Sequence, residues 1–184
     1  MQKFSFLLAA MMLTTLSLQA QKYFTREGKV SFFSDTPMEK IEAHNQQATA
    51  VVDLSNGNIE FAVLIKAFRF EKALMQEHFN ENYMESTKYP KATFKGQVVD
   101  FAKIDLKKDG SVTLKVKGTL TIKDVTKNVE TEGTFVVAKG ALSAKSAFKI
   151  AVADYNISIP KLVADKIAKT VDIKVDAALA PLNK

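Results

Sequence analysis

Side chains that could do chemistry are few in this chain of 184 residues. There is no cysteine, which excludes disulfides, zinc–thiolate sites, iron–sulfur clusters and cysteine nucleophiles. Two histidines, His44 and His78, are too few for a three-histidine metal centre within one chain. No Gly-x-Ser-x-Gly nucleophile turn and no glycine-rich phosphate loop is present. We therefore expect no enzyme activity, no metal site and no cofactor.

The clearest structural pattern lies in the segment 111–122, SVTLKVKGTLTI. Its apolar residues, among them Leu114 and Val116, alternate with Thr and Lys, which predicts a strand with one buried and one solvated face. Asp109-Gly110, just before it, is typical of a hairpin turn.

The same alternation recurs along the chain and predicts about eight strands. The other strands are expected around residues 29–34, 41–53, 59–65, 92–98, 129–137, 142–150 and 171–179. Many strands separated by short turns predict an antiparallel sandwich or barrel. Apolar residues at helical spacing in Glu71–Tyr83 predict one helix between strands, and a short helical turn is expected around Lys161–Ala168.

The first twenty residues have the layout of a secretory signal. Lys3 precedes an apolar run from Phe4 to about Leu18, and Ala20 offers a small residue for cleavage. We expect export, either to a periplasm or to the outside, and one mature domain over residues 21–184. The formal charge of +6 comes from scattered lysines, so we expect no nucleic-acid partner and no stable membrane insertion after cleavage.

Three segments carry a resemblance to a known family: Phe33–Pro37, Phe68–Phe94 and Gly118–Val129. Their sharpest parts are His78-Phe79, Tyr83-x-Glu85, Tyr89-Pro90-x-Ala92-x-Phe94 and Leu120-Thr121-Ile122. Together they resemble the YceI-like family of exported bacterial lipid-binding proteins, over residues 23–180. The sequence departs from the family pattern in one turn, where it has Asp124-Val125-Thr126 and Asn128. The resemblance implies an all-β, eight-stranded, antiparallel, lipocalin-like barrel that holds a long apolar chain, typically a polyisoprenoid.

An eight-stranded barrel is either filled by its own side chains or holds one ligand. Bulky and small residues share the inward positions, so the pattern itself is compatible with both. If the barrel is hollow, we expect an isoprenoid-like lipid, such as a polyprenyl or quinone tail, to lie against a wall of Phe32, Phe61, Val63, Ile65, Phe68, Phe94, Leu114, Val116, Phe135 and Phe148, with Met75, Phe79 and Tyr83 at the closed end. If it is filled, we expect an exported stress-response or interaction module without a lipid ligand.

The helix over residues 71–83 has two compatible interpretations: it closes one barrel end over the core, or it gates a ligand. His78 could be a hydrogen-bonded structural residue or contact a ligand headgroup, and Arg69 could meet an anionic headgroup or stay on the surface. His78 is also the single plausible acid or base if the protein were an enzyme acting on a lipid headgroup. The sequence is also compatible with a homo-oligomer.

Overall fold

Strands account for most of the chain in the computed structural model, which describes residues 22–182. The expected signal segment 1–20 lies outside these residues. The strands are β1 (Lys22–Asp35), β2 (Lys40–Asp53), β3 (Asn58–Leu64), β4 (Arg69–Phe70), β5 (Lys91–Val98), β6 (Gly110–Ile122), β7 (Val125–Ala138), β8 (Ala141–Ala151) and β9 (Thr170–Pro181). One helix, α1 (Ala73–His78), continues into a π-helical turn, Phe79–Tyr83. None of the helices in residues 22–182 is long and apolar enough to span a bilayer.

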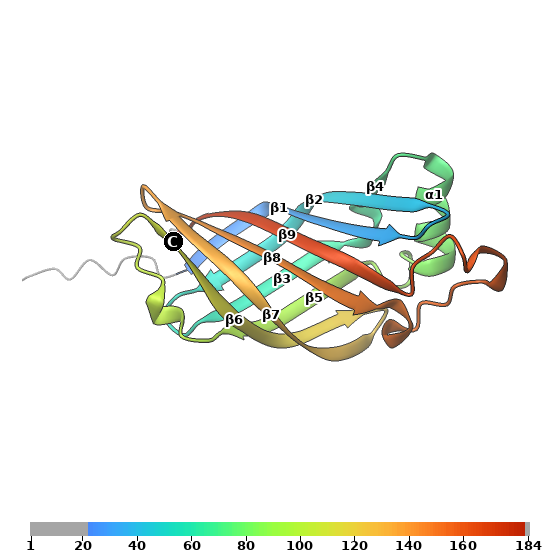
Figure 1. The fold of residues 1–184 in the computed structure, drawn as a ribbon. Coiled ribbons are helices and arrows are strands. Elements are labelled where there is room, and N and C mark those ends of the chain that lie inside the picture. Colours follow the sequence, from blue (N-terminus) through green and yellow to red (C-terminus); the bar gives the residue numbers. More distant parts are fainter. Residues whose placement is uncertain (1–21, 183–184) are drawn as a thin grey trace, which may run out of the picture.

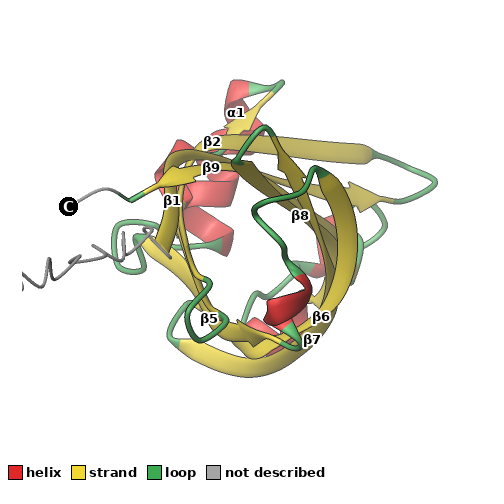
Figure 2. Cartoon of the chain, turned by 90° about the vertical axis from the view of Figure 1, so that its left-hand side faces the viewer, coloured by secondary structure: helices red, strands yellow, loops and turns green. Residues whose placement is uncertain are grey.

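Eight of these strands form a closed antiparallel barrel (Figures 1 and 2). They pair in the order β1-β9-β8-β7-β6-β5-β3-β2, and pairing of β1 with β2 closes the ring. The prediction of an eight-stranded antiparallel barrel with one short helix is confirmed. The two-residue strand β4, which pairs with β2 through Ala43 and Phe70, was not predicted because two residues cannot display an alternation.

Alternating residues place one face of every strand inside the barrel. In β6, Leu114 and Val116 are buried and Lys115 is exposed. Gly96 of β5 and Gly118 of β6 face each other across two paired strands, and the ring of Phe94 lies against both. A Cβ on either glycine would collide with the backbone of the neighbouring strand, so glycine at this pair lets the ring lie over the wall.

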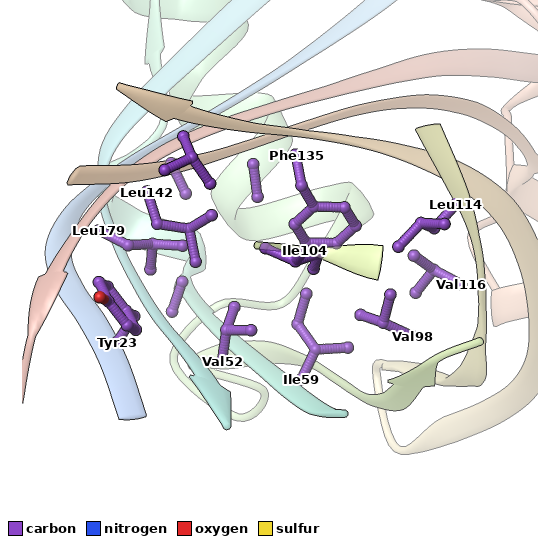
Figure 3. Packing of buried hydrophobic residues seen from close by; sticks show 14 residues of the cluster. Tyr23, Val52, Ile59, Val98, Ile104, Leu114, Val116, Phe135, Leu142 and Leu179 are labelled. Atoms are coloured by element: carbon purple, nitrogen blue, oxygen red, sulfur yellow. The ribbon is translucent and has the colours of Figure 1, made fainter. Parts of the chain in front are cut away.

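A packed cluster of apolar side chains fills the end of the barrel that is on the left in Figure 1. Buried side chains from all eight barrel strands meet there, and Figure 3 shows how they pack. The loop 99–109 between β5 and β6 caps them with Ile104, Phe101 and Leu106. The predicted hairpin turn at Asp109-Gly110 is therefore wrong: Gly110 begins β6, and the connection is this longer capping loop. Phe101 lies against Gly57, whose φ of +76° also favours glycine.

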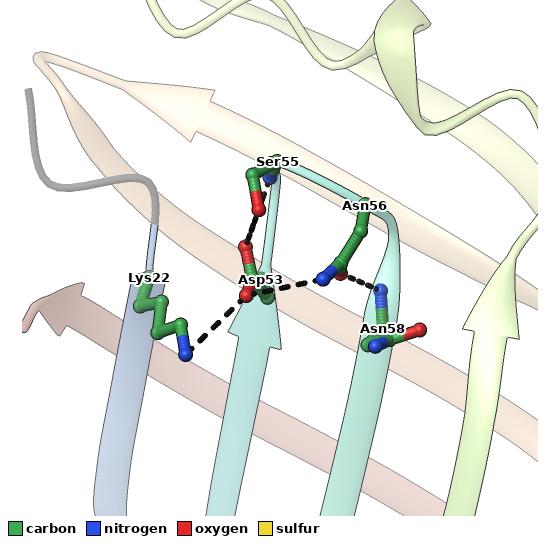
Figure 4. A network of polar contacts seen from close by, with 5 residues as sticks. All are labelled: Lys22, Asp53, Ser55, Asn56 and Asn58. Atoms are coloured by element: carbon green, nitrogen blue, oxygen red, sulfur yellow. Dashed lines mark hydrogen bonds and ion pairs between the residues drawn. The ribbon is translucent and has the colours of Figure 1, made fainter.

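A polar network fixes the turn between β2 and β3 at the same end (Figure 4). The Asp53 carboxylate accepts hydrogen bonds from the backbone N–H and the hydroxyl of Ser55, and it forms an ion pair with Lys22 at 3.5 Å. These partners, with the Ser55 hydroxyl first, hold the pKa of Asp53 below its usual value against the opposing effect of burial. The turn that seals the packed end therefore depends on an ionised carboxylate.

The helix lies at the opposite end, at the right in Figure 1. Its predicted range, Glu71–Tyr83, agrees with α1 and the π-helical turn that follows, except for the first two residues. Met75, Phe79 and Tyr83 lie at this helix end, as expected for residues of the covering helix, whereas the end closed by side-chain packing is the other one. Three residues of the expected turn at Lys161–Ala168, Lys161–Val163, form a 3-10 turn.

Candidate binding cavity

A cavity of about 340 Å³ occupies the half of the barrel next to the helix. All eight barrel strands contribute to its wall, for example through Phe61 of β3, Phe148 of β8 and Val171 of β9. The π-helical turn and the loop 152–169 between β8 and β9 line it toward the open end. The barrel is therefore neither a continuous tunnel nor a filled core: one half is packed and the other is hollow.

The packed core forms the floor of the cavity. Ile59, Val116 and Phe135 belong to the packed cluster and also line the cavity. From Val116 to Ile122, β6 rises by about 20 Å, which at the usual strand tilt is about 15 Å along the barrel axis. A linear apolar chain of a few isoprene units can lie at full length in such a space, and a longer one must fold back or protrude.

Four phenylalanines join the helix to the barrel wall. The ring of Phe79 lies 5.3 Å from that of Phe32, 5.6 Å from that of Phe68 and 5.0 Å from that of Phe70, between centroids. Phe32 also meets Phe68 and Phe70 edge to face, at 5.4 and 5.7 Å. These separations lie within the favourable range for aromatic pairs, so the cluster anchors the helix beside the cavity.

Of the thirteen residues predicted for the wall and the helix end of the site, twelve line the cavity. They are Phe32, Phe61, Val63, Ile65, Phe68, Met75, Phe79, Tyr83, Phe94, Val116, Phe135 and Phe148. Leu114 does not: it points inward as predicted, but it lies one inward position closer to the packed end and is buried in that cluster.

The two residues predicted to meet a headgroup lie in different places. His78 lines the open end of the cavity and is exposed. Arg69 does not line it, because alternation in β4 turns Phe70 toward the cavity and leaves Arg69 exposed on the outer face. Of the two alternatives for Arg69, the surface position is the one that the structure has.

His44 lies on the outer face of the barrel, in hydrogen bonds with two neighbours. Its Nδ1 is 2.8 Å from the Ser31 hydroxyl, and its Nε2 is 2.8 Å from a Glu42 carboxylate oxygen. Among residues 22–182, no group of three or more His, Asp or Glu side chains is placed to hold a metal ion.

Several lining residues were not predicted. Phe70 belongs to the unpredicted strand β4, and Ile157, Ile159, Val163 and Ile167 belong to the loop between β8 and β9. The alternation of Ile157 and Ile159 was a weak signal for a segment that faces the interior. Ser34 holds this loop to β1, since its hydroxyl accepts a hydrogen bond of 2.8 Å from the backbone N–H of Ala168.

A buried lysine connects the segments around the open end. The Lys123 side chain is 8% exposed, and its Nζ lies 2.6 Å from a Glu85 carboxylate oxygen. It also donates to the backbone carbonyls of Tyr83, at 3.0 Å, and Asn156, at 3.4 Å. Hydrogen bonding and charge from Lys123 lower the pKa of Glu85. Lys123 thus ties the π-helical turn to the segment after β8.

Hydrogen bonding in the barrel wall is interrupted between β7 and β8. Pairing between β7 and β8 stops at Gly133 and Ser146, although β7 remains paired with β6 to its first residue and β8 with β9 to its last. The hydroxyls of Thr131 and Ser146 lie 3.3 Å apart at this point and line the cavity, together with the outer-face residue Lys145. The mainly apolar wall therefore has polar atoms at this interruption.

Comparison with known proteins gives a family match and a set of similar folds. A family model described as a YceI-like domain matches residues 15–179. A polyisoprenoid binding domain from Saccharophagus degradans, implicated in plant cell wall breakdown, has a TM-score of 0.77 at 14% identity, covering 89% of this chain and 99% of that one. BcnA of Burkholderia cenocepacia has a TM-score of 0.69 at 19% identity, covering 83% of this chain and 96% of that one. A YceI protein from Campylobacter jejuni has a TM-score of 0.57 at 20% identity, covering 77% of this chain and 85% of that one. No curated protein matches. At these identities, the structural likeness establishes a shared fold.

Proposed function

The chain belongs to the family of YceI-like domains, and from this premise we propose that it is a non-enzymatic binding protein that holds an isoprenoid-like lipid in its barrel, outside the cytoplasm, for transport, storage or sequestration. The apolar cavity above the packed floor is the observation that carries the proposal. The description of the Saccharophagus degradans relative as a polyisoprenoid binding domain supports the ligand class.

The energetics of the cavity favour a long apolar tail. Burial of each methylene contributes about 0.8 kcal/mol, so a tail of about 20 carbons gives more than 10 kcal/mol before association costs of similar order. Phe61, Phe94 and Phe148 offer extended apolar area. Useful affinity therefore needs little recognition of a headgroup.

The position of the floor suggests how a lipid would lie. Since the packed cluster blocks one end, the tail would enter first and the polar end would remain at the open end. Glu39, His78 and Lys166 line the cavity there and offer both acidic and basic partners. A quinone ring and a polyprenyl phosphate are two headgroups that such partners can accommodate.

Export completes the proposal. The segment 1–20 would act as a cleaved signal, and residues 21–184 would form the mature protein in a periplasm or outside the cell. In the segment 1–20, the apolar run after Lys3 and the small residue Ala20 support this assignment.

A charge placed on the cavity wall tests the function. Phe61→Asp should abolish retention of a prenyl lipid, because the buried carboxylate would have to be desolvated beside the tail. Leu64→Asp is the matched control: Leu64 belongs to the same strand and is 40% exposed on the outer face. Bound lipid is measured by solvent extraction, and circular dichroism checks the fold. A folded Phe61→Asp protein that keeps the wild-type amount of lipid contradicts the proposal.

A further inference from the structure

The most exposed large apolar side chains of residues 22–182 gather at the open end of the barrel. Leu162 is 94% exposed, Met38 67% and Leu74 61%. Met38 lies in the turn between β1 and β2, Leu74 in α1, and Leu162 in the loop between β8 and β9. Figure 1 places α1 and that loop at the right-hand end, opposite the packed core.

Each of these three side chains is next to a residue that lines the cavity. Met38 precedes Glu39, Leu74 precedes Met75 and Leu162 precedes Val163, and each of these second residues belongs to the lining. Leu74 also lies one helical turn before His78, another lining residue, on the same helix face. The exposed apolar side chains therefore surround the mouth of the cavity.

The loop side of this mouth is basic. Lys161, Lys166 and Lys169 flank Leu162, with Asp165 as the one carboxylate between them. None of the three lysines forms an ion pair with another residue of the range 22–182. On the other side, Lys72 pairs with Glu39 at 3.2 Å, and Lys40 lies 3.9 Å from Asp35. Glu77 and Glu81 also lie on the helix side, so the unpaired positive charge is concentrated beside the most exposed leucine.

We propose that the mouth of the barrel docks onto a lipid bilayer that carries anionic headgroups, with Leu162, Met38 and Leu74 inserted into its surface. Basic residues beside exposed apolar side chains are the pattern that binds anionic membrane surfaces. The three apolar residues come from separate segments around an opening, so they do not form the continuous apolar patch that a folded partner would bury. A fluid bilayer can accept each of them independently. This proposal goes beyond the proposed function and does not depend on a ligand in the cavity.

Vesicle binding tests the proposal on protein exported to and purified from a bacterial periplasm. Vesicles of equal parts phosphatidylglycerol and phosphatidylcholine should bind the protein, and pure phosphatidylcholine should bind it less. Leu162→Ser should lower the partition coefficient by about tenfold, as expected for loss of a buried leucine. Met38→Ser should act in the same direction. Val99→Ser and Leu182→Ser are matched controls, because these residues are 37% and 39% exposed but do not line or adjoin the cavity.

Three results would overturn docking: no binding of the wild type to either vesicle, equal binding to both, or equal losses in the mouth and control variants. Light scattering measures whether a second copy of the protein binds at the mouth instead of a bilayer. A dimer that Leu162→Ser dissociates would assign the mouth to self-association. Phe61→Asp separates this proposal from the proposed function, since its cavity charge should remove bound lipid and leave vesicle binding unchanged. Simultaneous loss of both properties in that variant would contradict independent docking.

Discussion

Replacing Phe79 tests whether the aromatic cluster holds the helix over the cavity. Phe79 makes three ring contacts, with centroid separations between 5.0 and 5.6 Å. Each such pair contributes about 0.5–1.5 kcal/mol beyond the burial of area, and leucine keeps much of the burial. Because Phe79 is only half-buried, we take values near the low end and expect Phe79→Leu to cost about 2 kcal/mol.

This cost should appear locally. The helix α1 has six residues and no side-chain cap at its N-terminus, so it depends on packing for its stability. Loss of 2 kcal/mol corresponds to an increase of about 30-fold in the opening equilibrium of the segment. We therefore expect faster hydrogen exchange at residues 75–84 and a higher dissociation rate of any bound lipid.

Native-state hydrogen exchange measures the effect, with Phe33→Leu as control. Phe33 is on the same strand as Phe32, but its ring faces His44 and Lys174 on the outer surface. The control should leave exchange in the helix unchanged. Wild-type exchange at residues 75–84 in Phe79→Leu, or the same acceleration in both variants, would refute the anchoring role of the cluster.

Three further predictions concern stability. Since the pKa of Glu85 is lowered in the folded protein, its ion pair with Lys123 should stabilise the fold above the ordinary glutamate pKa, and this stabilisation should be lost as pH falls through the lowered value. Hydrogen-exchange protection around residue 156, measured against the intrinsic exchange rate at each pH, should therefore fall in acid, and Glu85→Gln should remove that pH dependence. Asp53→Ala should lower the free energy of unfolding by about 1–3 kcal/mol in urea titrations, and an unchanged midpoint would contradict the role of its network. Gly118→Ala should lower the free energy of unfolding by about 1–3 kcal/mol, because the added Cβ collides with the neighbouring strand. Gly110→Ala is the control and should be nearly neutral, because no atom lies within 4 Å of a Cβ added there. Equal urea midpoints for the two variants would count against the close approach at Gly118.

The barrel could be predicted because its strands alternate strictly. Leu114 and Val116 are both apolar and are two positions apart in β6, so both face inward. The pattern gives a side chain's face but not its height in the barrel, and the height decides which of the two lines the cavity. Height depends on the closure of the packed end by the loop 99–109, whose capping residue Ile104 has no periodic neighbours to indicate its role.

The lining residues that were predicted lie on long strands or on the helix and its π-helical turn, apart from Ile65 and Phe68, but other inward residues of the same strands, such as Val171, also line the cavity and were not named. Phe70 and Ile157 were missed because they belong to a two-residue strand and to a loop, where alternation is too short to read. Arg69 illustrates the converse: its charge suggested a headgroup contact, but its position beside the inward-facing Phe70 sends it to the outer surface. Lys123 gave no signal, because its contacts join segments distant in the sequence.

Native mass spectrometry of the protein exported into a bacterial periplasm tests the central claim most directly. We predict a complex with a bound mass of several hundred daltons that is released by solvent extraction and identified as a prenyl lipid. The contradictory result is a bare protein that stays bare after incubation with quinones and with polyprenyl phosphates.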